Sequence, residues 1–303
     1  MNTKCPIHIA FNIDSAYVRF CCVTLVSIFE NNRDNQICIH ILCNGLSIND
    51  INTIQSLADR YGSTVSFYTP NNSLLEGFKV CKFRKRISLA TYYRCILSLV
   101  IPNSIHQIIY LDCDLLVLGS LRPLWETNMQ NIGIAGVRDI AANDESRYQV
   151  LAYPPSHSYF NAGVMLINLD YWRQHNIAEA CINLYREHPE RILFNDQDIL
   201  NILFHENKVE LDIKYNMQDG FYRRACSSIP LEKLKSPIIL HFTNRKPWDY
   251  DNLHPLRHLF FKYQDLTSYR DLKPMHDTLS RIKRFFYLLS FHLHIRKPKY
   301  ITL

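Results

Sequence analysis

Glycine is scarce in this chain, with 8 residues among 303, and no glycine-rich loop follows the first predicted strand. That strand runs into Asp14-Ser15-Ala16-Tyr17 instead. A dinucleotide-binding fold or a P-loop needs closely spaced glycines at this point, so the sequence excludes both. If a diphosphate binds here, side chains or a metal ion must neutralise its charge in place of backbone amides.

Three further features are missing. There is no Cys-x-x-Cys pair, which argues against a structural zinc site. No apolar run approaches the ~20 residues that a membrane-spanning helix needs. Residues 1–5 hold no apolar core, so we expect no signal peptide and a cytoplasmic protein. In that reducing compartment the ten cysteines would remain thiols, most of them buried.

The body of the chain also lacks an excess of positive charge. The whole chain has 34 Lys and Arg against 28 Asp and Glu, a net charge of +6. Six of the basic residues lie between Arg281 and Leu303, a stretch without any acid. The rest of the chain is therefore neutral, which argues against nucleic acid as a partner.

Apolar segments alternate between strand and helix lengths in the first half of the chain. This order predicts an α/β fold with a mostly parallel central sheet covered on both faces. We assign residues 1–250 to one catalytic domain and 251–303 to a short helical, basic and aromatic segment. Residues 141–159 are polar and predict a long loop, either a lid over a site or a solvated insertion. The expected strands are 7–13, 37–43, 64–68, 107–111, 162–169 and 237–242, and the expected helices are 16–29, 48–61, 88–100 and 195–204, the last capped by Asn195.

Asp112-Cys113-Asp114 follows the apolar strand at 107–111. Side chains at i and i+2 of extended backbone point the same way, so both carboxylates face one site. Such a pair suits Mn²⁺, with Mg²⁺ as the alternative, although a turn with two solvated acids would look the same. His241 also ends an apolar strand and could be a third ligand. Arg245 and Lys246 follow it, as cations suited to a diphosphate.

The remaining motifs can be read structurally or functionally. Asn195-Asp196-Gln197-Asp198 begins a helix, where acids are favoured by the helix dipole alone. Phe160-Asn161-Ala162-Gly163 could be only a tight turn, and Arg94 only a surface charge.

Taken together and in order, the motifs resemble glycosyltransferase family 8, which contains bacterial lipooligosaccharide galactosyltransferases and glycogenin. They are Phe11-x-x-Asp14-x-x-Tyr17, Arg86-Ile87-Ser88-x-x-x-Tyr92-x-Arg94, Tyr110-Leu111-Asp112-Cys113-Asp114, Phe160-Asn161-Ala162-Gly163-Val164, Asn195-Asp196-Gln197-Asp198 and His241-Phe242-Thr243 with Lys246-Pro247-Trp248.

The resemblance implies a GT-A-type fold and a retaining hexosyltransferase that uses a UDP-sugar, UDP-galactose or UDP-glucose, on a glycan or lipid-linked glycan acceptor. It implies a role in lipopolysaccharide or surface polysaccharide synthesis. Asp112, Asp114 and His241 would hold Mn²⁺. The donor would be bound by a larger set: Asn12, Asp14, Tyr17, Arg94, Asp112, Cys113, Asp139, Asn161, Gly163, Asp196, Gln197, His241, Asn244 and Lys246.

The chain departs from the family pattern at two places. Ala16 stands where the family usually has Asn, and the loop Asn244-Arg245-Lys246 is one residue shorter and lacks its Gly. Arg245 could therefore share the phosphate role of Lys246. Retention by double displacement would need a nucleophile, Gln197 or Asp196, whereas a front-face reaction, which we favour, needs none. Asp112 and Asp114 are the other catalytic candidates, through the metal.

The tail from Arg281 mixes cations with aromatic and aliphatic residues, which is typical of a segment that lies on an anionic membrane surface. A terminal helix packed on the body would have the same composition. We expect peripheral attachment at the inner face of the cell membrane. Two other functions fit the Asp-x-Asp motif: a haloacid-dehalogenase-type phosphatase with Asp112 as nucleophile, and a non-catalytic sugar-nucleotide or glycan-binding protein.

Overall fold

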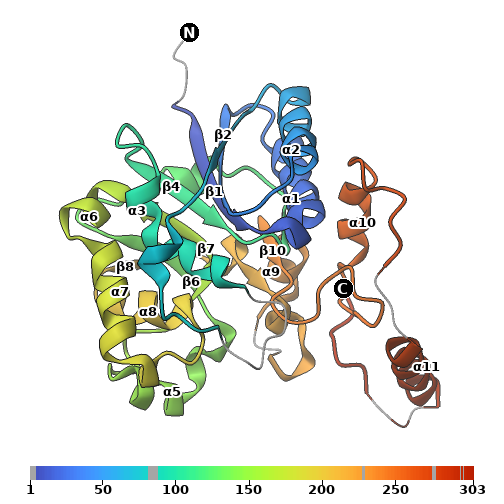
Figure 1. The fold of residues 1–303 in the computed structure, drawn as a ribbon. Coiled ribbons are helices and arrows are strands. Elements are labelled where there is room, and N and C mark those ends of the chain that lie inside the picture. The colour runs from blue at the N-terminus through green and yellow to red at the C-terminus, as the bar shows by residue number, and fades with distance from the viewer. Residues whose placement is uncertain (1–4, 81–87, 227–228, 275–277, 294, 296) are drawn as a thin grey trace.

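The computed structural model describes residues 5–80, 88–226, 229–274, 278–293, 295 and 297–303. Its centre is a seven-stranded sheet with helices on both faces (Figure 1). The four strands at one edge are parallel, while β7 runs antiparallel to both of its neighbours. In spatial order the strands are β3 (Thr64–Tyr68), β2 (Ile37–Cys43), β1 (Ile7–Ile13), β4 (Gln107–Leu111), β7 (Phe160–Asn168), β6 (Ile134–Arg138) and β8 (Lys208–Glu210).

A second sheet of three short strands consists of β5 (Leu115–Val117), β10 (Ile239–His241) and β9 (Met217–Gln218). β10 pairs antiparallel with β5, and this register sets His241 opposite Leu115. Leu115 directly follows Asp114. The pairing therefore brings His241 beside the Asp-x-Asp motif, which is far away in the chain. The predicted strand at 237–242 is confirmed, though shorter.

Two groups of helices bury the two faces of the large sheet. One face packs against α1 (Val18–Asn31) and α2 (Ile48–Arg60), and α10 (His258–Gln264) lies against α1. The other packs against α3 (Leu97–Val100), α6 (Leu169–Gln174), α7 (Ile177–Glu187) and α8 (Asp196–Phe204). The remaining helices are α4 (Arg122–Trp125), α5 (Glu145–Leu151), α9 (Leu231–Lys235) and α11 (Thr278–His292). Every helix in the described ranges is too short or too polar to span a bilayer.

The predicted strands at 7–13, 37–43, 64–68 and 107–111 are confirmed at the same residues. The predicted helix at 48–61 is also confirmed, and its start has a clear cause. Ser47 accepts a hydrogen bond from the Asp50 amide while Asp50 accepts from the Ser47 amide, so the two side chains cap the first turn reciprocally.

The predicted helix at 88–100 is mostly a 3₁₀ helix, η3 (Leu89–Ile96), followed by the short α3. Residues three apart lie above one another in a 3₁₀ helix. Thr91 and Arg94 are such a pair, and both bond to Asp196. The tertiary contact therefore decides the helix type.

Two other predictions were wrong in part. Residues 141–159 are not one long loop, because they contain α5, which begins at the capping residue Asp144 and packs a small core of its own. Asn195 does occupy the first position before α8, but its side chain makes no capping bond. Its backbone is in the left-handed region, at φ 54°, and Asp198 accepts from the amides of Leu193 and Phe194 instead.

Two histidines and a tyrosine form a chain across β1, β2 and β3. His8 Nδ1 lies 2.9 Å from His40 Nε2, and His40 Nδ1 lies 3.0 Å from the Tyr68 hydroxyl. Burial, with a smaller contribution from His8, lowers the pKa of His40 from its ordinary 6.5 to about 4. His40 is therefore neutral in the folded protein over the pH range in which it would already be charged in the unfolded chain.

We expect His40 to make the protein acid-sensitive. Between pH 6.5 and pH 4 the unfolded chain binds a proton at this site that the folded chain does not, so falling pH favours unfolding by about 3 kcal/mol. Urea unfolding across this pH range should show the stability of wild type falling more steeply than that of His40→Gln as pH falls. The exposed His258, replaced in His258→Gln, is the control. Parallel profiles for wild type and His40→Gln would contradict this account.

Candidate active site

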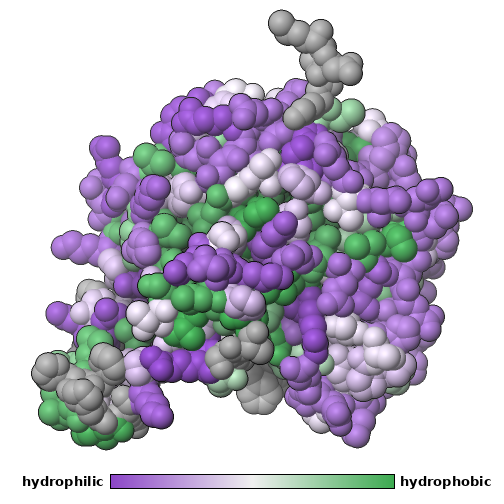
Figure 2. Space-filling model, turned by 180° about the vertical axis from the view of Figure 1, so that it is seen from behind, coloured by the Kyte–Doolittle hydropathy of each residue, from purple (hydrophilic) through white to green (hydrophobic). Residues whose placement is uncertain are grey.

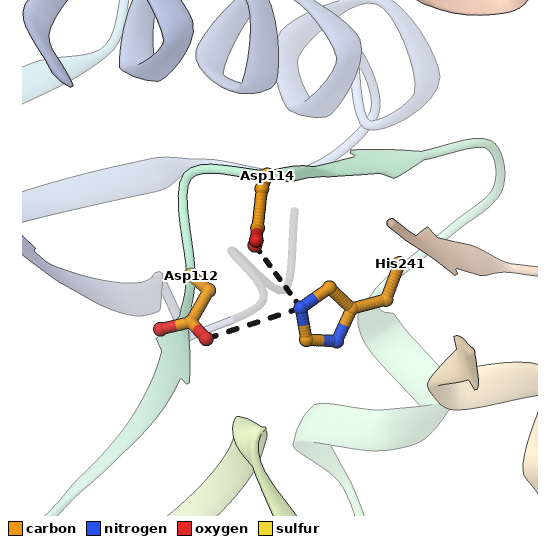
Figure 3. A group of neighbouring side chains, drawn as sticks. All are labelled: Asp112, Asp114 and His241. Atoms are coloured by element: carbon orange, nitrogen blue, oxygen red, sulfur yellow. Dashed lines mark hydrogen bonds and ion pairs between the residues drawn. The ribbon is translucent and has the colours of Figure 1, made fainter. Parts of the chain in front are cut away.

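Three side chains from two distant parts of the chain meet at the end of β4 (Figure 3). Asp112 follows β4, Asp114 precedes β5, and His241 ends β10. His241 Nε2 lies 3.0 Å from Asp114 Oδ1 and 3.9 Å from Asp112 Oδ2. Their ligand atoms all lie within 4.8 Å of one another, so the residues predicted as metal ligands are close enough to share one ion.

His241 is held by a residue that the sequence analysis missed. Its Nδ1 lies 2.9 Å from Oδ1 of Asn216, which is fully buried. The Asn216 amide nitrogen donates to Asn161, so its oxygen must face His241 and accept from Nδ1. Nε2 then points at the two carboxylates. A polar residue between Tyr215 and Met217 was the available signal, but nothing in the sequence connects it to His241.

Asp114 is paired with the ammonium group of Lys246, which also donates to the backbone oxygen of Phe242 at 3.0 Å. Burial by itself would raise the pKa of Asp114, but Lys246 and His241 outweigh it and hold the pKa well below its ordinary range. Arg245, the alternative to Lys246, points elsewhere. Its side chain is 56% exposed and lies 3.5 Å from Asp251.

Arg94 joins the predicted metal ligands to the start of α8. Its guanidinium donates to Asp112 Oδ1 at 2.8 Å and lies 3.0 Å from Asp196 Oδ2. A third nitrogen donates to the Ala162 carbonyl at 2.7 Å. Burial opposes the charge on Arg94, but Asp112 and Asp196 more than compensate and raise its pKa. Arg94 is thus a buried ion-pair residue.

Two hydroxyl groups complete the bonding of these carboxylates, and neither was predicted. Thr91 donates to Asp196 Oδ1 at 2.5 Å, and Tyr110 donates to Asp112 Oδ1 at 3.0 Å. Burial still raises the pKa of Asp196 above its ordinary value, against the opposing effect of Arg94. Both oxygens of Asp196 therefore have a partner.

A second network joins β6, β7 and α8. Asp139 Oδ2 accepts from Asn161 at 2.8 Å and from the Gln197 amide nitrogen at 3.3 Å. The Gln197 carbonyl oxygen accepts from the Ala162 backbone at 3.1 Å. Because Asn161 also accepts from Asn216, this network is continuous with the one that holds His241.

Gly163 lies where the two networks meet. A Cβ atom at this position would overlap Cε1 of His241 and stand 2.7 Å from Asp112 Oδ2. No side chain fits there while the predicted ligands keep their positions, so the close approach itself requires glycine.

The predicted nucleotide-binding residues lie at the end of the neighbouring strand. β1 pairs with β4 through Ala10 and Tyr110, so Asn12 and Asp112 fall at the same level of the sheet. Both amide atoms of Asn12 are buried with no hydrogen-bond partner among the described residues. Asp14 accepts from the Ala16 amide at 3.1 Å, and the Tyr17 ring meets Trp248 edge-on.

The other predicted residues divide into three cases. Cys113 is buried between the two aspartates, and burial raises the pKa of its thiol. Asn244 donates to Asp219 Oδ2 at 3.1 Å, outside the ligand cluster. Arg86 and Ile87 lie outside the described residues. The structure thus brings together Asp112, Asp114, His241, Arg94, Asp196 and Lys246 as one charged cluster.

Comparison with known proteins identifies relatives over most of the chain. Residues 8–252 match the family model of glycosyl transferase family 8. General stress protein A of Bacillus subtilis is 27% identical over 277 residues, which cover 88% of this chain and 95% of that protein. The lipopolysaccharide 1,3-galactosyltransferase of Salmonella typhimurium is also 27% identical, over 84% of this chain and 77% of that protein.

The fold is that of solved GT-A glycosyltransferases. The galactosyltransferase LgtC, crystallised with donor and acceptor sugar analogs, superimposes with a TM-score of 0.77 at 25% identity, covering 91% of this chain and all of that chain. These matches decide against the phosphatase and the non-catalytic alternatives. The predicted fold class and family are confirmed: the chain belongs to glycosyl transferase family 8 and is a glycosyltransferase.

Proposed function

We propose that this protein is a retaining, Mn²⁺-dependent hexosyltransferase that moves galactose or glucose from a UDP-sugar to a glycan acceptor in lipopolysaccharide or surface polysaccharide synthesis. Family membership supports a sugar-nucleotide donor and a glycan acceptor. Relatives named as lipopolysaccharide glucosyl- and galactosyltransferases support the hexose and the pathway. The observation that carries the proposal is the Asp112, Asp114 and His241 cluster beside Lys246.

The chemistry of this cluster fits a divalent metal ion. Two carboxylates and one imidazole are the mixed oxygen and nitrogen donors that Mn²⁺ accepts. Since Asn216 takes the Nδ1 hydrogen of His241, Nε2 faces the carboxylate oxygens and needs either a proton or a cation between them. A bound metal would act as a Lewis acid toward the departing diphosphate. Lys246 would add a second positive charge on the same side.

The uracil end of the donor would lie at β1. Asn12 has an unpartnered buried amide, and such groups usually have a hydrogen-bond partner when their ligand is present. We assign it, with Cys113, to the nucleoside. Asp14 would accept from the uracil N3–H, and Tyr17 would stack on the base.

Arg94, Asp139, Asn161, Gly163 and Asp196 would orient the sugar. They form two rigid networks next to the ligand cluster, in which nearly every polar atom already has a fixed partner. Preorganised groups of this kind bind one arrangement of sugar hydroxyls without reorganising during the reaction. Asn244 would contact the diphosphate from the loop after β10.

The bonding of Gln197 and Asp196 supports a front-face reaction. The Gln197 carbonyl oxygen accepts from Ala162, and the Asp196 oxygens bind Thr91 and Arg94, so neither offers an unengaged nucleophile. In a front-face reaction the bond from the sugar to the diphosphate oxygen breaks as the acceptor oxygen bonds to the same carbon. The acceptor proton passes to the departing diphosphate.

We further propose that α11 attaches the protein to the inner face of the cell membrane. Its apolar side chains form a green surface at the lower left of Figure 2. Phe285 and Phe286 are 62% and 61% exposed, and they directly follow the cations at 281, 283 and 284. Exposed aromatics beside Lys and Arg favour an anionic lipid surface.

The function is tested with a panel of UDP-sugars in Mn²⁺, scored first by hydrolysis and then by transfer to glycan acceptors. We expect turnover of UDP-galactose or UDP-glucose. Asp112→Ala should slow it by at least about 100-fold, since a Lewis-acid metal contributes several kcal/mol to such a step. Asp34→Ala, an exposed aspartate, is the control. Full activity of Asp112→Ala in Mn²⁺ would exclude the metal role.

Asn216→Ala should weaken Mn²⁺ binding by about 10- to 100-fold, because the residue that orients a metal-binding imidazole strengthens its coordination. Calorimetric titration with Mn²⁺ measures this directly. Asn32→Ala removes another buried asparagine, one that bonds Gly119 and Leu121 away from the cluster, and should leave the affinity unchanged. Equal Mn²⁺ affinity in Asn216→Ala and wild type would rule out His241 as an Asn216-oriented ligand.

Replacing both exposed phenylalanines of α11, in Phe285→Ser with Phe286→Ser, should reduce binding to phosphatidylglycerol-rich vesicles at least about tenfold, since each buried ring contributes about 1.5–3 kcal/mol. Vesicle sedimentation measures the binding, and added salt should weaken it in the wild type. Leu99→Ser, which removes an apolar side chain that is 60% exposed elsewhere, is the control. Undiminished sedimentation of the double variant would refute membrane attachment through α11.

A further inference from the structure

Asp219 is a fully buried carboxylate outside the ligand cluster, and its partners come from three parts of the chain. Oδ2 accepts from Asn244 and from Arg223, both at 3.1 Å. Oδ1 accepts from the hydroxyl of Tyr300 at 2.7 Å. A buried carboxylate is stable only when its oxygens accept hydrogen bonds. Losing one of these three donors would therefore disturb the carboxylate to which the other two are bonded.

Tyr300 lies at the end of the chain, well beyond the family match at residues 8–252. The chain returns to the body there after α11 (Figure 1). The backbone of residues 299–301 is hydrogen-bonded to η7 (Asp219–Tyr222) and to the residues that follow η7. The Ile301 amide donates to the Tyr222 carbonyl at 2.9 Å, and the Arg224 amide donates to the Lys299 carbonyl at 3.1 Å. Residues 299–301 are thus built into the body.

The ring of Tyr300 also joins an aromatic cluster behind the site. His254 lies at its centre, with ring centroids 5.6 Å from Tyr300 and 5.1 Å from Phe242. Phe242 follows the predicted ligand His241 directly. The hydroxyl and the ring of Tyr300 therefore both act on the loop at 242–246, one through Asp219 and the other through His254.

α11 is tied to the same loop. Arg284 donates to the carbonyls of Tyr250 and Asn252 at 2.9 and 3.2 Å. Asn252 in turn donates to the Arg245 carbonyl at 2.7 Å. The Tyr287 hydroxyl accepts from the Lys299 amide at 3.0 Å, which joins α11 to the chain end.

From these contacts we infer that Tyr300 is a positioning residue for the donor site. Residues 299–301, which bond to Asp219 through the Tyr300 hydroxyl and to Tyr222 and Arg224 through the backbone, form a C-terminal clamp. This clamp holds the loop at 242–246, and with it Asn244 and Lys246, in the geometry that receives the diphosphate. The inference rests on the proposed function only for the identity of the ligand. The clamp itself is a property of the protein alone.

Tyr300→Phe tests the clamp, because it removes one hydroxyl and keeps the ring. We expect the donor KM in Mn²⁺ to rise about tenfold with a smaller change in kcat, within the range that a hydrogen bond to a charged group supplies. Tyr263→Phe is the matched control. Tyr263 is also buried, and its hydroxyl bonds to Asn31 away from the site, so this variant should lose stability without a change in donor KM.

A double-mutant cycle separates positioning from a purely structural effect. If Tyr300 acts through Asp219 on Asn244, then Tyr300→Phe should have little further effect on donor KM in the Asn244→Ala background. A full additional effect in that background would overturn the path through Asp219. An unchanged donor KM in the single variant Tyr300→Phe would overturn the positioning role.

Hydrogen exchange without any ligand tests the clamp independently of the donor. Tyr300→Phe should speed amide exchange at Phe242, Lys246 and Asp249, whose amides are bonded within this region, and leave β1 unchanged. Unchanged exchange at these amides would overturn the clamp. Faster exchange in a protein that binds no uridine diphosphate with Mn²⁺ would support the clamp and remove the donor assignment instead.

Discussion

The structure around the site depends on the compensation of buried negative charge. Asp114 and Asp196 are buried and Asp112 is half-buried at the rim of the sheet, where isolated carboxylates would be costly. Arg94 lies between Asp112 and Asp196, and Lys246 pairs with Asp114. These cations come from η3 and from the loop after β10, so the ion pairs join both sheets and the helical layer. A divalent ion would complete the same balance at His241.

Asparagine side chains continue the network of fixed contacts beyond the ion pairs. Asn216 orients His241 and donates to Asn161, which donates to Asp139. An amide can accept and donate at once, so such a chain fixes the direction of each bond. The predicted metal-ligand side and the predicted sugar side of the site are therefore one mechanical unit. Gly163 at their junction leaves no space for a side chain.

The C-terminal segment connects this unit to the surface proposed to meet the membrane. α11 carries exposed aromatic residues on one side and Arg284 on another, and Arg284 bonds the loop that follows Lys246. Tyr300 reaches the preceding loop at 242–246 through Asp219, and Asn252 joins the two stretches by donating to the Arg245 carbonyl. Membrane attachment and donor binding would then share structural elements, so binding at one could alter the geometry of the other.

Local pattern alone predicted the four strands at 7–13, 37–43, 64–68 and 107–111, because alternation and β-branched residues depend on neighbours in the chain. It also predicted that Asp112 and Asp114 share one side, and ordered motifs indicated the family. The 3₁₀ form of η3 and the helix α5 were not predictable in this way. Both depend on packing, through the Asp196 contacts in one case and a small core of tyrosines in the other.

What the sequence by itself determined is thus the order of the elements and the chemical kinds of group at the rim of the sheet. Tertiary structure alone decided that His241 stands opposite Leu115, that Lys246 rather than Arg245 pairs with Asp114, and that Asn216 and Tyr300 support them. These contacts join residues more than twenty positions apart. Strand register and the need to pair buried charges determine which residues meet in these contacts. Neither can be predicted from a local sequence pattern.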